Sequence, residues 1–177
     1  MSEAHPFAFT FFTAKRTRVT LPGVMPELRT PSRLRGFDYS RSRTYFLTFC
    51  VWDRFRVFSN PTAAGIACRH IEEYRLREWF WLLAFCVMPD HIHILIRLRR
   101  AGLRLDRLVA SLKNRIQRSG RDLLIDFKWQ PGFFDRVLRE GDDPTKLAAY
   151  IVENPVRAGL VTVSRDYPYG RIVDRWF

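Results

Sequence analysis

Cysteine is scarce in this 177-residue sequence, and its three copies are widely spaced. Cys50, Cys68 and Cys86 form no Cys-x-x-Cys pair, and their number is odd. This pattern excludes the disulfide framework of a small secreted domain and offers no zinc knuckle. We therefore expect reduced cysteines in the core of a cytoplasmic protein.

Long hydrophobic runs are also missing. The sequence has no stretch of about 18 apolar residues, which is roughly the length that a membrane-spanning helix requires. The apolar segment at residues 7–12 is short and runs into Lys15 and Arg16, unlike the hydrophobic region of a signal peptide. We expect no membrane partner.

Acidic residues are outnumbered, with 18 Asp and Glu against 30 Lys and Arg, which gives a net charge of +12. Such a balance says little about the fold but favours a polyanionic partner, with nucleic acid ahead of an acidic membrane surface. Hydrophobic residues make up 47% of the chain, which is typical of a folded protein.

The first 43 residues show neither a strand period nor a helix period and carry scattered prolines and basic residues, among them Arg41 and Arg43. We interpret residues 1–43 as a loosely ordered basic arm that grips DNA phosphates. A solvated tail without a role is the alternative.

The rest of the chain alternates strands and helices. Strands are predicted at residues 44–52, 80–88, 91–98 and after Pro131-Gly132, and helices at residues 61–77, at residues 105–120 and from Asp143-Pro144 to Asn154-Pro155. This order predicts an α+β fold, a ferredoxin-like β-α-β-β-α-β sandwich with a four-stranded antiparallel sheet and helices on one face, plus a C-terminal tyrosine-bearing helix. Residues 44–165 would form this domain, and residues 166–177 an irregular tail.

Two histidines open the strand at residues 91–98. Side chains alternate along a strand, so His91 and His93 point to the same face, within reach of one ion. A histidine pair on a rigid strand is half of a catalytic metal site, although both could be ordinary strand residues. His70 falls on the buried stripe of its helix, where a packed histidine is the more common role.

Tyr150 and Asn154 lie four residues apart and so share one side of the last helix. If that helix packs beside the histidine strand, a phenol and an amide oxygen join the histidines around one divalent ion. Asn154 would be the third ligand, and the Tyr150 hydroxyl would attack a phosphate held by the ion. An ordinary half-buried tyrosine is the alternative.

The polar side of the helix at residues 105–120 is basic, with Arg107, Lys113, Arg115 and Arg118. It forms either a phosphate-binding rail or a solvated face. Aromatic side chains such as Tyr45, Trp129 and Phe133 could stack on unpaired bases, but a core position is the more common role for each.

Three separated segments resemble a known family. They are Val87-Met88-Pro89-Asp90-His91-Ile92-His93, Trp129-Gln130-Pro131-Gly132-Phe133-Phe134-Asp135-Arg136, and Tyr150-Ile151-Val152-Glu153-Asn154-Pro155-Val156-Arg157-Ala158-Gly159-Leu160-Val161. In this order they resemble the IS200-like single-tyrosine transposases, also called Y1 or HUH transposases. The nearest branch is the one associated with repetitive extragenic palindromes, or REP sequences. Asp90 departs from the family, since many relatives have Asn there.

The resemblance implies a single-stranded DNA endonuclease and strand transferase that uses Mg²⁺ or Mn²⁺. It implies recognition of a REP-like DNA hairpin and nicking through a 5′-phosphotyrosine, with His91 and His93 as metal ligands and Tyr150 as the nucleophile. Asn154 occupies the place of a third, amide ligand, and Arg136 in the second segment is expected to contact DNA. The protein would be a monomer, or a homodimer with exchanged tyrosine helices.

Two other functions remain open at this point. A ferredoxin-like sheet with aromatic residues and a positive charge also suits a non-catalytic module that binds hairpin DNA or RNA. A metal-dependent hydrolase without a covalent step is the second alternative. Of the three functions, only the transposase needs both the histidine pair and Tyr150.

Overall fold

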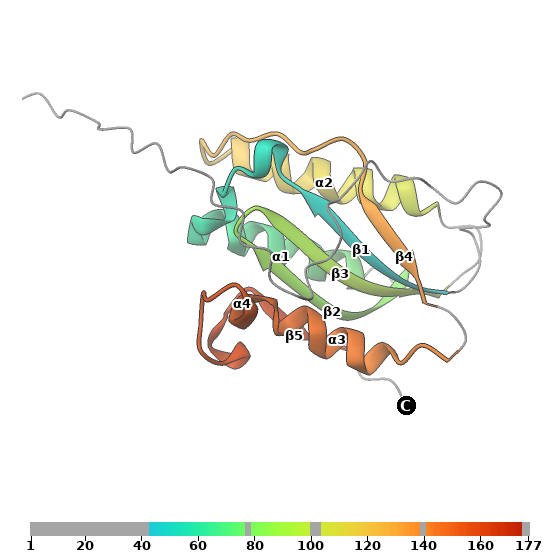
Figure 1. Ribbon diagram of the computed structural model, residues 1–177. Coiled ribbons are helices and arrows are strands. Elements are labelled where there is room, and N and C mark those ends of the chain that lie inside the picture. The colour runs from blue at the N-terminus through green and yellow to red at the C-terminus, as the bar shows by residue number, and fades with distance from the viewer. Residues whose placement is uncertain (1–42, 77–78, 100–103, 139–140, 175–177) are drawn as a thin grey trace, which may run out of the picture.

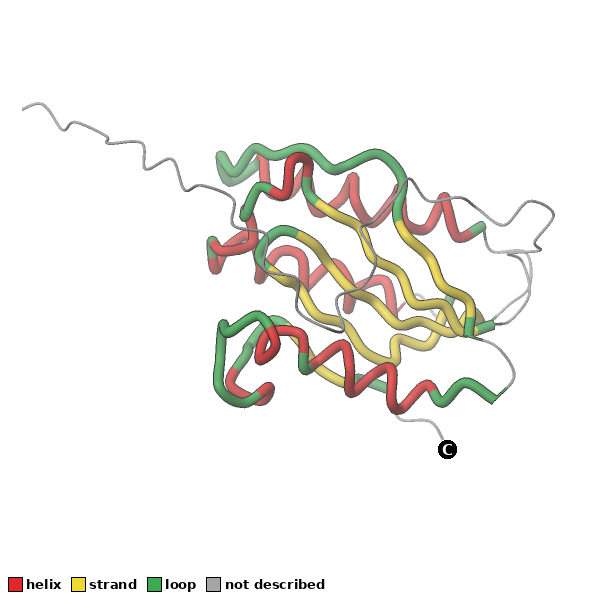
Figure 2. The backbone as a smooth tube through the Cα atoms, viewed as in Figure 1, coloured by secondary structure: helices red, strands yellow, loops and turns green. Residues whose placement is uncertain are grey.

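A twisted antiparallel sheet with helices on both faces organises the chain (Figures 1 and 2). The computed structural model describes residues 43–76, 79–99, 104–138 and 141–174. The predicted basic arm, including Arg41 but not Arg43, therefore lies outside the described residues. Among the described helices, none has the length and apolar character that crossing a bilayer would require.

The sheet has five strands in the order β4-β1-β3-β2-β5, and every neighbouring pair is antiparallel. The strands are β1 (Thr44–Cys50), β2 (Phe80–Met88), β3 (His91–Leu98), β4 (Phe134–Val137) and β5 (Gly170–Ile172). The first four strands have the order and the connections of the predicted ferredoxin-like sandwich, which is confirmed. The predicted count of four strands is corrected to five, since β5 adds to the free edge of β2.

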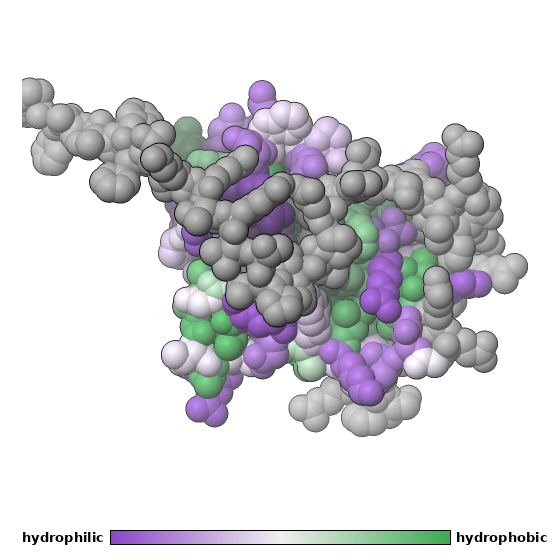
Figure 3. All heavy atoms as spheres, in the orientation of Figure 1, coloured by the Kyte–Doolittle hydropathy of each residue, from purple (hydrophilic) through white to green (hydrophobic). Residues whose placement is uncertain are grey.

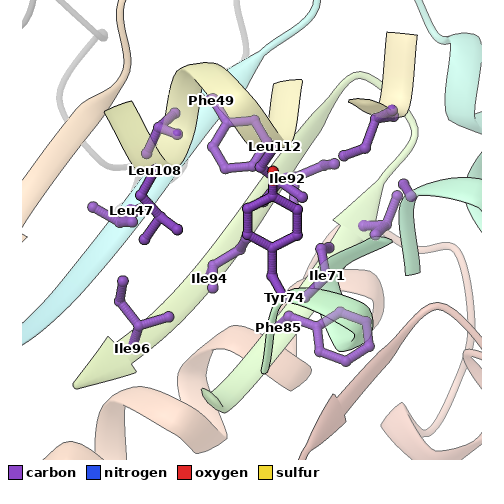
Figure 4. Close-up of a cluster of buried hydrophobic side chains, with 14 of the residues drawn as sticks. Leu47, Phe49, Ile71, Tyr74, Phe85, Ile92, Ile94, Ile96, Leu108 and Leu112 are labelled. Atoms are coloured by element: carbon purple, nitrogen blue, oxygen red, sulfur yellow. The ribbon is translucent and has the colours of Figure 1, made fainter. Parts of the chain in front are cut away.

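Helices α1 (Pro61–Leu76) and α2 (Leu105–Arg121) cover one face of the sheet. Alternate residues of the central strands point to this face and pack with apolar residues of both helices. Figure 4 shows part of this cluster, including Leu47, Phe49, Ile92, Ile94, Ile96, Tyr74 and Leu112. These side chains are almost fully buried, so this layer is the main core.

Helix α3 (Pro144–Val152) packs on the opposite face, and the short helix α4 (Asn154–Arg157) follows it (Figure 1). A second apolar cluster joins Ile151 of α3 to Phe46 of β1 and Leu95 of β3. Leu95 shares its side of β3 with His91 and His93, because residues two apart point the same way. The tyrosine-bearing helix therefore lies on the histidine face of the sheet.

The predicted helix starts are confirmed by their capping bonds. The Asn60 side chain accepts hydrogen bonds from the backbone N–H groups of Thr62 and Ala63, at 2.9 and 3.3 Å. Asp143 accepts from the backbone N–H of Thr145 at 2.8 Å, and Pro144 takes the first helical position. Each cap satisfies N–H groups that have no partner within the helix.

Three boundaries differ from the prediction. Strand β1 ends at Cys50 rather than at residue 52, and the chain turns through the 3-10 helices η1 (Trp52–Arg54) and η2 (Val57–Ser59). Pro155 does not stop the helical path, because it takes an early position of α4, where a missing N–H costs nothing. The expected irregular tail at residues 166–177 instead contains β5, and η3 (Ser164–Asp166) forms where that tail begins.

The close packing of β5 gives a stability prediction. A Cβ atom at Gly170 would lie 3.0 Å from the Cys86 sulfur and 3.3 Å from the Phe85 carbonyl oxygen. We expect Gly170→Ala to lower the free energy of unfolding by about 1–2 kcal/mol, measured by chemical denaturation. Gly65→Ala is the control, because its Cβ would meet no atom within 4 Å and should stabilise α1 by about 0.5–1 kcal/mol. Wild-type stability in Gly170→Ala would contradict this packing of β5.

Candidate active site

The two histidines of β3 face one another at the start of the strand. The Nε2 atoms of His91 and His93 are 3.0 Å apart, and the ring centroids are 4.6 Å apart. His93 is buried and His91 is partly exposed. The hairpin between β2 and β3 fixes this arrangement, since Pro89 and Asp90 form a two-residue connection directly before His91. The predicted pairing of the two side chains is thus present.

Each histidine has a second partner at its other ring nitrogen. The Nδ1 atom of His91 lies 2.6 Å from the Asp90 carboxylate, and that of His93 lies 2.8 Å from the Thr48 hydroxyl. An ionised carboxylate can only accept, so a neutral His91 donates from Nδ1 and turns the lone pair of Nε2 towards His93. Arg54 holds Asp90 in turn, with Nε 2.8 Å from the carboxylate. Such outer partners orient histidines that bind metals.

The electrostatic surroundings keep these groups in the protonation states that a metal site needs. Burial alone would raise the pKa of Asp90, but the hydrogen bond from His91 and the Arg54 charge hold it below its ordinary value. Burial, followed by the nearby His91, Arg54 and Arg157, lowers the pKa of His93 well below its ordinary value. His93 is therefore neutral at physiological pH, as a metal ligand must be.

The spacing of the histidines fits a divalent ion. Two donor atoms that each lie about 2.1 Å from an ion, at a right angle, are about 3.0 Å apart. The observed separation of the Nε2 atoms is 3.0 Å. Within the described residues, no cluster of three or more His, Cys, Asp or Glu side chains could hold an ion. A bound ion would therefore need further ligands of another kind, such as an amide, water or phosphate oxygen.

Tyr150 lies on α3, half-buried against the second apolar cluster. The Arg157 guanidinium carbon lies 3.9 Å from the centroid of the Tyr150 ring, and Arg157 also donates to the Tyr150 carbonyl. The charge of Arg157 also helps to lower the pKa of His93. Tyr150 and His93 lie on the same side of the sheet, because α3 packs on the face that Leu95 shares with the histidines.

Asn154 has a structural role at the end of α3. Its amide nitrogen donates to the carbonyl oxygens of Tyr150 and Ile151, each at 3.1 Å. These bonds satisfy carbonyl groups that the end of a helix leaves without partners. In the described part of the chain, the side-chain hydrogen bonds of Asn154 run to α3 and none reaches a histidine. The third-ligand role of Asn154 remains a prediction.

The predicted basic rail on α2 lies away from the histidines. Arg107, Arg115 and Arg118 are exposed, but α2 packs on the opposite face of the sheet. Lys113 is not on that exposed side: only 8% of it is accessible, and its ammonium donates to the carbonyl oxygens of Gln130 and Gly132. The expectation of a solvent-facing Lys113 is corrected, because the loop before β4 covers it.

Arg136 is the one predicted DNA-binding residue of the described chain that shares the histidine face. It pairs with Phe46 across β1 and β4, is exposed, and lies 3.6 Å from the Asp142 carboxylate. Arg43 directly precedes β1. His91 pairs with Cys50 at the other end of that strand, so Arg43 lies at the end of β1 away from the histidine pair. Figure 3 shows hydrophilic and hydrophobic residues interspersed over the described surface on this side.

Other residues considered from the sequence turn out to be packed. His70 is buried, with Nδ1 2.9 Å from Glu73 and Nε2 2.8 Å from Ser119, so its packed role is confirmed. Tyr45 is fully buried, and the indole N–H of Trp129 donates to the Lys113 carbonyl. The Tyr45 ring is therefore no stacking surface, and the partly buried Trp129 ring packs edge-on against Phe49 and Phe127.

Sequence reasoning missed three residues around the histidines. Thr48 reaches His93 only through the register of β1 on β3. Arg54 ends the 3-10 helix η1, whose first residue, Trp52, is predicted as the end of a strand. Arg157 belongs to the third family-like segment, at residues 150–161, but the sequence assigns it no role. The best available signal was the basic character of Arg157, one turn after the Asn154-Pro155 pair.

A family comparison agrees with this site. Residues 40–154 match the family described as "Transposase IS200 like". The chain belongs to the IS200-like transposase family. The matched range of this IS200-like chain contains both histidines of the pair, as well as Tyr150 and Asn154.

Two individual proteins are similar to this IS200-like chain. A protein of Haemophilus influenzae named as a REP-associated tyrosine transposase is 27% identical over 149 residues, which are 75% of this chain and 81% of the relative. A solved structure described as a REP-associated tyrosine transposase bound to a REP hairpin aligns with a TM-score of 0.63 at 22% identity, over 82% of each chain. The structural likeness concerns the fold.

Proposed function

We propose that this IS200-like protein is a metal-dependent single-stranded DNA endonuclease and strand transferase that recognises a REP-like hairpin and nicks beside it. The observation that carries the proposal is the convergence of two histidine Nε2 atoms, 3.0 Å apart, on the sheet face that also holds the Tyr150 helix. A non-catalytic binding module would need neither feature.

In the proposed step, the phenolic oxygen of Tyr150 attacks the scissile phosphorus and gives up its proton to a base. The bond from phosphorus to the 3′ oxygen breaks, and that oxygen leaves with a proton as a free 3′-hydroxyl. The phosphate stays on the 5′ end of the downstream strand, where it is joined to Tyr150 as a 5′-phosphotyrosine. When bound between His91 and His93, Mg²⁺ or Mn²⁺ would polarise the phosphate. Asn154 would contribute its amide oxygen, because its nitrogen already binds helix carbonyls.

Recognition of a hairpin is supported by the similar solved structure, which is described as bound to a REP hairpin, and by the net charge of +12. Arg136 would contact DNA near the nick, whereas Arg107, Arg115 and Arg118 would meet phosphates remote from it. Because α3 packs on the sheet of its own chain, the proposed site can be assembled within one chain without exchange of tyrosine helices.

The proposal is tested with end-labelled DNA that carries a hairpin and a single-stranded extension, incubated with the wild-type protein and Mn²⁺. We expect a protein–DNA adduct that survives denaturation, and none when EDTA replaces Mn²⁺. Tight binding without cleavage would favour the non-catalytic module. Cleavage without any adduct would favour a metal-dependent hydrolase.

Arg157 gives a prediction within this proposal. Its guanidinium stacks on the Tyr150 ring and donates to the Tyr150 carbonyl, so it can hold the nucleophile in place and offset phosphate charge. We expect Arg157→Ala to slow adduct formation about 10²-fold, with hairpin affinity changed less than about threefold. Exposed Arg165, whose side chain is 87% accessible, supplies the control Arg165→Ala. Equal rates for the two variants would contradict a role for Arg157.

A further inference from the structure

The loop directly after β1 presents two large aromatic side chains to solvent. Trp52 is 57% exposed and Phe55 is 61% exposed. Burying such rings is strongly favourable, so two of them in one short exposed loop indicate a surface that meets a partner. The main core does not need them, since it closes with Val51 before the loop and with Val57 and Phe58 after it.

The loop is ordered by backbone contacts to the segment that carries the histidines. The Val51 N–H donates to the Asp90 carbonyl and the Phe58 N–H to the Pro89 carbonyl, each at 2.9 Å. The Trp52 N–H donates to the Lys128 carbonyl at 2.7 Å. The bonds of Val51 and Phe58 hold both ends of the loop beside the turn between β2 and β3, which leads into His91.

Within the loop, the backbone adopts a conformation that side chains disfavour. Asp53 and Arg54 have φ angles of 50° and 56°, in the left-handed region that costs most residues about 1 kcal/mol each. This path lets the Arg54 guanidinium reach the Asp90 carboxylate at 2.8 Å and the Cys50 sulfur at 3.0 Å. Trp52 and Phe55 thus flank Arg54 in the sequence. Arg54 binds the Asp90 carboxylate, which in turn binds His91.

We infer that Trp52 and Phe55 form a stacking surface for unpaired bases of the DNA strand that enters the histidine site. This inference rests on the proposed nuclease function and names its contact with the substrate. Flat rings accept any base on their faces, and stacking is typical of proteins that hold single strands. Three observations favour nucleic acid over a protein partner: the position beside the histidines, the adjacent Arg54, and the net charge of +12.

The test measures binding of a short unpaired oligodeoxynucleotide with a 2-aminopurine base, in EDTA so that cleavage does not interfere. Stacking on a ring quenches the fluorescence of this base. We expect Trp52→Ala and Phe55→Ala each to weaken binding at least about fivefold and to reduce the quenching. Both side chains are exposed, so thermal unfolding should stay as in the wild type.

Trp81→Ala is the matched control. Trp81 is 45% exposed but lies near the start of β2, paired with Arg97 at the end of the sheet away from the histidines. Unchanged binding in Trp52→Ala and Phe55→Ala, or an equal loss in Trp81→Ala, would overturn the inference. A shift of Trp52→Ala from dimer to monomer in light scattering, with binding of the oligonucleotide unchanged, would overturn it in favour of a protein interface.

The two proposals fail separately. If the wild-type protein forms a tyrosine adduct and the loop variants bind and cleave as it does, only the stacking surface is refuted. If no adduct forms but binding of unpaired DNA depends on Trp52 and Phe55, the surface stands and the nuclease function falls.

Discussion

Tyr150→Phe is expected to abolish the covalent protein–DNA adduct and to lower strand cleavage by at least about 10³-fold. The substitution removes only the hydroxyl that would attack phosphorus. The ring remains, so its contact with the Arg157 guanidinium and its packing against the second apolar cluster are retained. We expect hairpin affinity and melting temperature to stay close to those of the wild type. The measurement is denaturing electrophoresis of labelled DNA after incubation with Mn²⁺.

Tyr169→Phe provides the matched control for this prediction. Tyr169 is also half-buried, and it stacks edge-on against Tyr167 with ring centroids 5.6 Å apart. Its hydroxyl should have no part in the reaction, so the adduct should form at the wild-type rate. Cleavage that continues in Tyr150→Phe would mean that water attacks the phosphate. The protein would then be a hydrolase without a covalent step.

The elements that the sequence predicts well are those whose signal is local. Side chains alternate between the two faces along any one strand. This alternation is enough to place His91 and His93 on the same face, whatever the strand pairs with. The caps at Asn60 and Asp143 need only a few neighbouring residues. The predicted hairpin strands at residues 80–88 and 91–98 have the observed bounds, since a Pro-Asp turn separates two clear apolar runs.

What the sequence does not show depends on contacts between distant segments. Lys113 is expected on the basic, polar side of α2, with Arg107, Arg115 and Arg118. Its burial comes from the loop that contains Gln130 and Gly132, which supplies two carbonyl acceptors. β5 is three residues long, too short for a period, and forms because the edge of β2 is free to pair.

The same distinction applies to the candidate site. Thr48 and His93 are 45 positions apart, and only the register of β1 on β3 brings them together. The placement of Arg157 depends on the short helix α4. The last helix predicted from the sequence ends at Asn154-Pro155, so α4 is not predicted. The sequence therefore predicts the two histidines but not the residues that orient them.

His93→Ala is expected to abolish metal-dependent cleavage, and it separates metal binding from fold stability. The variant removes one of two Nε2 atoms 3.0 Å apart and leaves the Thr48 hydroxyl without its partner. We expect Mn²⁺ to raise the melting temperature of the wild type and to leave that of His93→Ala unchanged. Hairpin binding in EDTA should persist, because phosphate contacts do not involve the histidines. Thr48→Val should weaken Mn²⁺ affinity more mildly, about 10-fold to 100-fold.

His70→Ala is the control that makes this result specific. His70 is 8% exposed and His93 is 7% exposed, and each has hydrogen bonds at both ring nitrogens. Both substitutions should cost stability, about 1–3 kcal/mol, because one leaves the buried Thr48 hydroxyl and the other the partly buried Ser119 hydroxyl without its histidine partner. Only His93→Ala should lose the Mn²⁺-induced rise in melting temperature. If His70→Ala loses it as well, the metal response reflects overall stability, and the histidine pair of β3 is not the metal site.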